Sequence, residues 1–471
     1  MSSIRFLVWA ILFCGGRREA QAFETTYWVW HRETSLSVEE KRSLRAQHVE
    51  RLYWHVGTAQ ASGPGWKLGA AQKLPIQGGD EAEIIPVLRL SAEGVLPLGA
   101  VAQAQVVLML KEAAHGINAK EVQLDFDCPT RLLKSYALFL SGCRRELGKI
   151  QLSITALGGW SRSSDFSAIQ ASVDRIFPMF YDLYPDTPQE ALSGNVRPLL
   201  DPESLRRQLQ SWRSCRIPWL AGLPNFARVS IFNPEGQSRG HLRRWQWEDV
   251  CFNPALAHRS QAGLGRTLLH VEGSTVVADT PVFAGELLAC RWPALSELAA
   301  AYKAAEAAGA AGIALFRLPG QGVQGAWSLR QLETLFATGK AGEASFSLKQ
   351  TDYGFELVNA SGSDLAPRLS GSSQSQDRGW QLEVESSEGA IFREASSGEF
   401  TSVYAHASPE ALEATTVPVQ VANRLTFRFA ELRAGKSLQS GLVQLSRNAN
   451  RSALRWRIPQ SSSNSHWQPL E

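Results

Sequence analysis

Residues 122–129 read Val-Gln-Leu-Asp-Phe-Asp-Cys-Pro, and this stretch decides how the chain is interpreted. Polar and apolar residues alternate up to the proline, as in a strand that is buried on one face. Side chains two positions apart share a face, so Gln123, Asp125 and Asp127 are expected to point the same way. A helical pattern follows over residues 131–147. The two acids therefore lie at the carboxyl end of a strand, where parallel α/β folds bind their ligands.

The paired acids indicate acid–base chemistry. Two carboxylates on one face repel each other, so that one of them tends to keep its proton. A protonated acid beside an ionised one is the equipment for general acid–base work on a glycosidic or acyl bond. Asp127 also has a purely structural interpretation, in which its carboxylate stabilises the start of the following helix by interacting with the unpaired backbone N–H groups there. That interpretation is weaker for Asp125, which lies deeper in the strand.

Apolar strand-like runs alternate with amphipathic helical patterns through the first two thirds of the chain. The expected strands are 26–31, 52–56, 83–90, 122–127, 152–157, 175–181, 218–223 and 312–318. Eight strands alternating with helices predict an α/β fold, a closed (β/α)8 TIM barrel, over residues 23–338. An open doubly wound sheet is the alternative, but no glycine-rich phosphate loop follows the first strand. Residues 232–290 are too long for a loop and alternate like antiparallel strands, which predicts an insertion on the rim.

The composition changes at residues 339–344 (GKAGEA), which we interpret as a linker. Over residues 345–458 helical periodicity is lost, and short apolar runs are separated by polar turns. That pattern and length predict an all-β sandwich domain. Residues 460–471 are polar and serine-rich, which predicts a disordered tail.

The N-terminus has the pattern of a signal peptide over residues 1–22, with a positive start, an apolar core and a small-x-small site before Phe23. Secretion or a periplasmic location is therefore expected. Lipid anchoring at Cys14 is the minority option, because the bulky Phe13 precedes it. No other segment is apolar and long enough for a transmembrane span. The near balance of 48 basic and 45 acidic residues argues against a nucleic-acid partner.

The motifs, taken in order, resemble those of family-18 glycoside hydrolases, the chitinase family. The family's fourth strand carries Asp-x-Asp-x-Glu; here Gln123, Asp125 and Asp127 occupy these three positions. Residues 152–157 resemble its fifth strand, and residues 179–182 (Met-Phe-Tyr-Asp) match its Met-x-Tyr-Asp on the sixth. Phe316 stands where the last strand usually carries Trp. The resemblance covers residues 25–335, and the whole chain also looks like a bacterial domain family of unknown function built on such a barrel.

The resemblance implies a mechanism in which the substrate's own acetamido oxygen attacks the anomeric carbon. Asp127 would protonate the leaving oxygen and Asp125 would orient the acetamido group, with Tyr181 and Asp182 binding the sugar. Two departures stand out: Asp127 is one methylene shorter than Glu, and Gln123 replaces an acid. The leading prediction is hydrolysis of a glycan containing 2-acetamido sugars. The alternatives are a non-catalytic, lectin-like barrel and a structural envelope protein with a vestigial cleft.

The expected sugar-binding residues are aromatic or polar side chains near strand ends. They are Tyr181, Asp182, Gln123, Met179, Trp28, Trp30, His55, Arg89, Trp160 and Phe316. Flat rings pack on sugar C–H surfaces, although burial in the core is the alternative for each tryptophan. His31 and His55 could join the acids around a divalent metal, but no His-x-His spacing supplies the usual ligands. The cysteines are scattered along the sequence, and their spacing matches neither a zinc site nor a disulfide framework. No metal or cofactor is expected.

Overall fold

The computed structural model describes residues 23–32, 34–70, 74, 82–320, 326–369, 378–389, 391–407, 416–446 and 453–470. The predicted signal peptide, residues 1–22, lies outside these ranges. Within them, no helix has both the length and the apolar character needed to cross a membrane.

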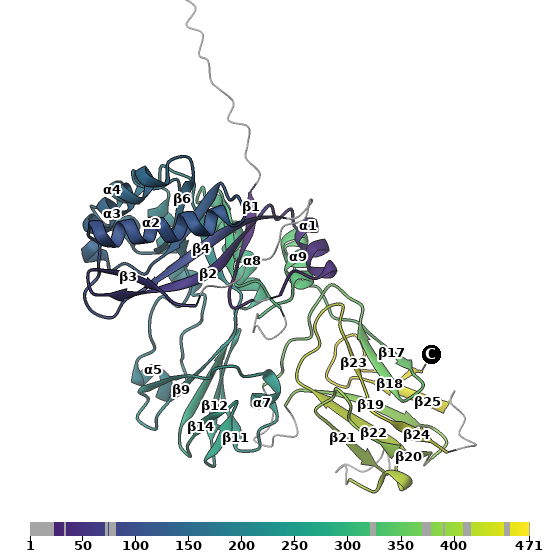
Figure 1. Cartoon of the computed structure of the whole chain (residues 1–471). Coiled ribbons are helices and arrows are strands. Elements are labelled where there is room, and N and C mark those ends of the chain that lie inside the picture. Colours follow the sequence, from purple (N-terminus) through teal and green to yellow (C-terminus); the bar gives the residue numbers. More distant parts are fainter. Residues whose placement is uncertain are drawn as a thin grey trace, which may run out of the picture.

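The first two thirds of the chain form a closed parallel barrel (Figure 1). Its strands are β1 (Glu24–Val29), β2 (Arg51–Ser62), β4 (Glu83–Ser91), β5 (Glu121–Asp125), β6 (Gln151–Leu157), β7 (Arg175–Met179), β8 (Leu220–Pro224) and β16 (Gly312–Phe316). They follow the order β1-β16-β8-β7-β6-β5-β4-β2, and pairing of β1 with β2 closes the ring. Strand β3 (Gly65–Leu68) adds to β2 in the antiparallel sense. The predicted TIM-type barrel is thus confirmed.

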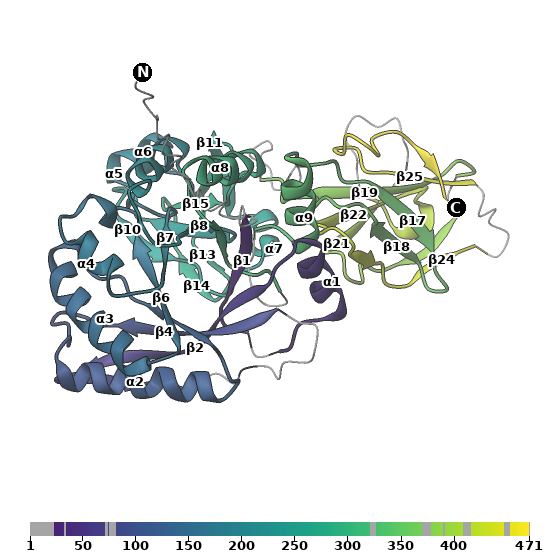
Figure 2. The same cartoon turned by 90° about the horizontal axis from the view of Figure 1, so that it is seen from above.

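Helices surround the barrel and cover the outer face of its strands (Figures 1 and 2). They are α1 (Val38–Ala46), α2 (Ala100–His115), α3 (Leu133–Leu147), α4 (Phe166–Gln170), α6 (Pro202–Trp212), α8 (Leu295–Ala307) and α9 (Leu329–Thr338), with 3-10 turns η1 (Thr130–Leu132) and η2 (Trp160–Arg162). Helix α5 (Pro188–Ser193) lies apart from the barrel, where its Ala191 packs with Phe232 and Leu268 (Figure 1). Local sequence sets several starts: Ser37 and Glu40 form a capping box at α1, and Asp201 caps α6 before a proline.

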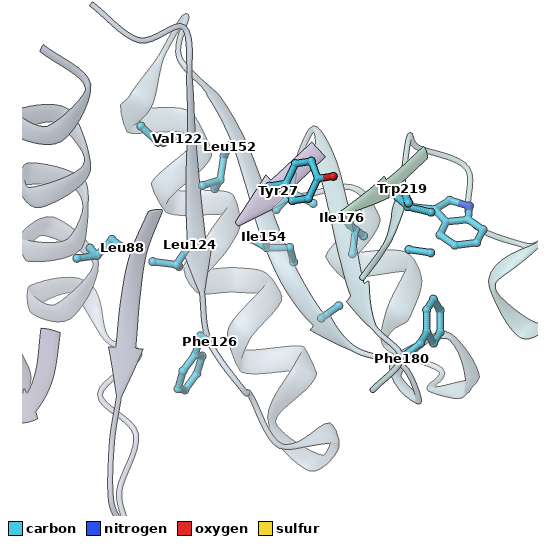
Figure 3. Close-up of a cluster of buried hydrophobic side chains, with 14 of the residues drawn as sticks. Tyr27, Leu88, Val122, Leu124, Phe126, Leu152, Ile154, Ile176, Phe180 and Trp219 are labelled. Carbon is cyan, nitrogen blue, oxygen red and sulfur yellow. The ribbon is translucent and has the colours of Figure 1, made fainter. Parts of the chain in front are cut away.

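Strict alternation along the strands separates two cores. Val122 and Leu124 of β5 point outward into the layer between strands and helices, beside Leu152 and Ile154 of β6 (Figure 3). The residues between them point into the barrel, whose interior is packed with aromatic and branched side chains. Those interior residues include Trp28, Trp30, Tyr53, Ile85, Val87, Phe177, Leu220 and Ala314. The period of two in the sequence therefore fixes that Gln123 and Asp125 face inward.

An antiparallel sheet interrupts the barrel between β8 and β16. Its elements are β9 (Arg228–Phe232), β10 (Ser238–His241), α7 (Trp247–Cys251), β11 (Leu256–Gly263), β12 (Arg266–Val271) and β15 (Leu287–Arg291), with a hairpin of β13 (Thr275–Val277) and β14 (Thr280–Val282). The strand order is β10-β9-β15-β12-β11. The sheet begins at Arg228, a few residues before the predicted start of the insertion, because the chain enters β9 directly from the carboxyl end of β8.

The C-terminal part consists of antiparallel sheets around a separate hydrophobic cluster. Its strands are β17 (Phe346–Gln350), β18 (Phe355–Asn359), β19 (Trp380–Ser386), β20 (Phe392–Ala395), β21 (Ser402–His406), β22 (Arg424–Phe429), β23 (Ser437–Gln439), β24 (Val443–Leu445), β25 (Leu454–Arg457) and β26 (Gln468–Pro469). This part lies beside α1 and α9 (Figure 2). Asp364 ties it to the barrel by accepting hydrogen bonds from the backbone N–H and hydroxyl of Ser328, the N-cap of α9.

The expected disordered tail differs from the structure. Residues 468–469 form β26 and pair with β25, and Trp467 lies beneath the guanidinium groups of Arg455 and Arg457, at 4.9 and 4.4 Å from their carbons to the ring centroid. A polar, serine-rich composition predicted disorder, but cation–π contacts and strand pairing with distant residues order the segment instead.

Candidate functional site in the mouth of the barrel

The acid pair lies at the carboxyl end of β5, as the sequence predicted. Asp125 is the last residue of the strand and is 7% exposed. Asp127 follows after Phe126, and its side chain is 55% exposed to solvent. The two carboxyl groups thus have different surroundings, one held inside the barrel mouth and one at its open surface.

Three neighbours determine the state of the Asp125 carboxyl group. The Thr155 hydroxyl, on the adjacent strand β6, donates to Oδ1 at 2.7 Å, and Arg89 Nη1, on β4, lies 3.8 Å from Oδ2. Burial raises the pKa of Asp125 from 3.8 to about 6, and the Asp127 charge adds to the rise. The Arg89 charge and the Thr155 hydrogen bond oppose it. Asp125 therefore changes protonation state in mildly acidic solution.

Arg89 connects the two acids. Its Nη2 lies 3.7 Å from Asp127 Oδ2, while its other terminal nitrogen faces Asp125. One guanidinium group thus lies between two carboxyl groups, and its charge lowers the pKa of Asp125 against the effect of burial. Because the Arg89 side chain is 42% exposed, solvent weakens these ion pairs.

Aromatic side chains form the floor and one side of the cleft. Trp28 is fully buried, and its indole N–H donates to Gln123 Oε1 at 2.6 Å. Phe316, at the end of β16, packs edge-on against Trp28 and Trp30, with ring centroids 6.3 and 5.6 Å apart. Tyr181 stacks on Phe316 at 5.9 Å between centroids and 16° between planes. The arrangement presents apolar ring surfaces beside the acids.

The turn after β7 brings a polar pair to the same mouth. Burial and the charges of the two acids raise the pKa of Tyr181 well above its usual range, so its hydroxyl remains a hydrogen-bond donor. Asp182 has a left-handed backbone with φ of 51°, a conformation that Asp tolerates better than most residues. Arg228, the first residue of the inserted sheet, holds its carboxylate at 2.6 Å.

These side chains line one open cavity of about 560 Å³. It is lined by Trp28, Trp30, Arg89, Asp125, Asp127, Thr130, Thr155, Leu157, Gly158, Gly159, Arg162, Met179, Tyr181, Asp182, Leu183, Tyr184, Gln208, Arg228 and Phe316. The structure therefore brings together both predicted acids and most of the predicted sugar-binding residues, including Met179. A volume of this order accommodates a small ligand or a few sugar rings.

Three predicted sugar-binding residues do not reach the cavity. Trp160 is fully buried between barrel and helices, and its indole N–H donates to the Cys128 carbonyl oxygen at 3.2 Å. His55 is buried beneath Trp30, with ring centroids 4.4 Å apart. Gln123 is fully buried beneath the floor, where it accepts from Trp28. Position near a strand end suggested ligand contact, but neighbouring side chains cover these groups, and their role is support.

Several residues lining the cavity were not predicted. Thr155 could have been found, because it continues the polar alternation on the inward face of β6. Arg162, Gln208 and Arg228 belong to η2, α6 and β9, and no local motif marks them. Only the folding of these elements over the barrel mouth brings them to the acids.

The described part of the chain contains no group of three or more His, Cys, Asp or Glu side chains arranged to hold a metal ion. Arginine rather than histidine lies next to the acids. The arrangement suits hydrogen bonding and proton transfer to a polar ligand that also offers apolar faces.

Comparison with known proteins gives one matching family model and several similar solved structures. Residues 81–239 match the model of a family described as a domain of unknown function (DUF3142). A search of curated proteins returns no match. Similar solved structures are the spore cortex-lytic enzyme SleL of Bacillus megaterium QM B1551 (14% identity, TM-score 0.43, covering 64% of this chain and 71% of that one) and a chitinase from Chromobacterium violaceum ATCC 12472 (15%, 0.41, 63% and 94%).

The chitinase-like agglutinin RobpsCRA of Robinia pseudoacacia is also similar, with 12% identity and a TM-score of 0.37, covering 62% of this chain and 94% of that one. At these low identities and TM-scores, the similarity to these structures gives no information about the chemistry of this chain. The fold assignment rests on the closed parallel sheet itself.

Proposed function

We propose that this barrel cleaves a glycan that contains 2-acetamido sugars, with Asp127 as the general acid. The observation that carries the proposal is the presence of Asp125, Asp127 and Tyr181 in one open cavity floored by aromatic rings. Sugars need such a combination, because their C–H faces pack on rings while their hydroxyl and acetamido groups require polar partners.

In the proposed reaction, the acetamido carbonyl oxygen of the bound sugar forms a bond to its own anomeric carbon. The bond between that carbon and the glycosidic oxygen breaks, and the leaving oxygen takes the proton of Asp127. Asp125 accepts a hydrogen bond from the acetamido N–H, and its charge stabilises the positive charge that develops on the ring. Tyr181 donates to the acetamido oxygen. Water then attacks the anomeric carbon, the bond between that carbon and the acetamido oxygen breaks to restore the acetamido group, and Asp127 takes the proton that the water loses.

A second function, binding of a glycan without cleavage, is favoured by one specific observation. Arg89 Nη2 lies 3.7 Å from Asp127 Oδ2, so the carboxyl group that has to reach the glycosidic oxygen is already paired with a guanidinium group. The shorter reach of Asp127 points the same way, since a displacement of about 1 Å can lower a rate roughly 100-fold.

Two variants of Asp127 separate the functions. If Asp127 is the acid, Asp127→Asn leaves oligosaccharide affinity nearly unchanged and lowers turnover roughly 100-fold or more. An enzyme adapted to Asp is also harmed by Asp127→Glu, whose side chain is longer. If the protein only binds glycans, the wild type shows no turnover. In that case Asp127→Glu, which restores the reach of a glutamate acid, is the variant expected to gain some turnover. Asp352→Asn, at an exposed position in the C-terminal part, is the matched control.

The assay combines calorimetric binding with product analysis on acetamido oligosaccharides. Undiminished turnover in Asp127→Asn would remove Asp127 from the mechanism.

The proposal extends to the remaining parts of the chain: the C-terminal sheets act as an accessory β-sandwich, and residues 1–22 direct export to the periplasm or the outside. Both rest on sequence pattern, and a mature N-terminus at Phe23 would support the second.

A further inference from the structure

One wall of the cleft holds two polar side chains without partners. Gln208 of α6 is 4% exposed, and its Oε1 is buried with no hydrogen-bond partner in the described structure. Arg162 of η2 lines the same cavity and is exposed to solvent. Across the described residues, its guanidinium group has no carboxylate within ion-pair distance. Because a buried polar group without a partner is costly, a ligand that hydrogen-bonds the Gln208 carboxamide would be favoured at this wall.

The two side chains lie against consecutive glycines, Gln208 against Gly158 and Arg162 against Gly159. A Cβ atom on Gly158 would come within 1.9 Å of Gln208 Oε1, so any larger residue there would displace the carboxamide from its present position. A Cβ atom on Gly159 would lie 3.6 Å from Arg162 Nη2. We call Gly158, Gly159, Arg162 and Gln208 the β6–α6 wall.

The β6–α6 wall is held in place by buried contacts behind it. The indole N–H of Trp212, a fully buried residue of α6, donates to the Gly158 carbonyl oxygen at 2.8 Å. The hydroxyl groups of Ser161 and Ser211 lie 2.6 Å apart and join η2 to α6. The two free polar groups are therefore presented by a fixed surface rather than by a loose loop.

Among the charged side chains that line the cavity, Arg162 differs from the others in its charge pairing. The lining contains three arginines and three aspartates. Arg228 is paired with Asp182, and Arg89 faces Asp125 and Asp127. Arg162 is the arginine of the cavity that is left without a counter-charge among the residues described.

We propose that the β6–α6 wall binds the carboxylate of an acidic sugar, so that the substrate is an anionic glycan; this inference rests on the proposed function. A guanidinium group matches a planar carboxylate with two parallel hydrogen bonds. The Gln208 carboxamide, which lines the same cavity, hydrogen-bonds a hydroxyl of the same sugar. The acidic sugar lies beside the sugar held by the acid pair, because β6 neighbours β5 and Thr155, three residues before Gly158, is bonded to Asp125.

The experiment measures the affinity of the full chain for an oligosaccharide of alternating 2-acetamido sugar and uronic acid. The reference ligand is the same oligosaccharide after reduction of its carboxylates to alcohols. We expect the wild type to prefer the acidic form about five- to tenfold at low salt, as one charge-assisted contact allows. Arg162→Gln should bring this ratio near one. Gln208→Glu, which places a carboxylate beside the bound one, should reverse it.

Arg145→Gln, at an exposed position on α3, is the control and should keep the wild-type ratio. Thermal unfolding of each variant shows whether it is folded. Equal affinity of the wild type for both ligands, or an unchanged ratio in a folded Arg162→Gln protein, overturns this inference and leaves the proposed function standing. Tighter binding of a sulfated acetamido oligosaccharide overturns the choice of carboxylate. Failure to bind any of these ligands overturns the proposed function as well.

Discussion

Replacing Asp125 by Asn should change how the stability of the protein depends on pH. The Asp125 carboxyl group is almost completely buried, and its pKa is raised from 3.8 to about 6, chiefly by burial. The folded protein therefore binds this proton more tightly than the unfolded chain does. Its contribution to stability is complete below about pH 3.8 and is lost as the pH rises through about 6.

The size of the effect follows from the two pKa values. A difference of one in pKa corresponds to about 1.4 kcal/mol, so the rise from 3.8 to about 6 corresponds to about 3 kcal/mol. Asn has the same shape and its amide oxygen can still accept from Thr155, but it does not titrate. Relative to wild type, the free energy of unfolding of Asp125→Asn should increase by about 3 kcal/mol between about pH 4 and about pH 7.

Urea unfolding followed by tryptophan fluorescence, repeated across this pH range, measures the difference between the two proteins. Asp352→Asn, where the carboxylate is exposed, controls for loss of a charge and should show a difference that does not change with pH. A constant difference for Asp125→Asn would refute the reasoning, because it would mean that the Asp125 carboxyl group is not desolvated. A carboxylate that lowers stability at neutral pH is understandable if it serves ligand binding.

Two further changes test the surroundings of the site. Thr155→Val removes the hydrogen bond to Asp125, so the pKa of Asp125 should rise further, by roughly one or more, in a carboxyl NMR titration; an unchanged value would contradict the assigned contact. Gly222→Ala places a Cβ atom 3.0 Å from a backbone oxygen and 3.1 Å from the Trp28 ring, so chemical unfolding should show a loss of about 1–3 kcal/mol. Gly273→Ala, with open space around it, should lose far less, and equal losses would argue against crowding.

The barrel could be predicted because its information is local. Alternation with a period of two marks each strand, and it also fixes which face of β5 carries Gln123 and Asp125. Parallel strands followed by helices then place both acids at one mouth without any knowledge of long-range contacts. The Met-Phe-Tyr-Asp run at residues 179–182, by contrast, was singled out by its resemblance to a family motif and not by local alternation.

Which side chains near the strand ends are buried could not be predicted as well as the strands themselves. Trp160 and His55 lie near strand ends like Trp30, yet the structure covers the first two and leaves the third in the cavity. Whether a ring near a strand end meets ligand or protein depends on which helix or loop lies above it. The ordered segment at residues 468–469 shows the same limit, because its partner strand is set by pairing rather than by composition.

The sequence by itself determined the barrel, the mouth at which the acids lie and the kind of chemistry that paired carboxylates permit. Only the tertiary structure decided the state of those acids and the shape of the cleft. Arg89, Thr155 and Gln208 come from three different elements, and Trp28 and Gln123 are bonded across 95 positions. The physical reason is that the alternation which marks a strand is a property of residues adjacent in the sequence. Desolvation, charge pairing and unsatisfied hydrogen-bond groups depend instead on which distant segments come into contact.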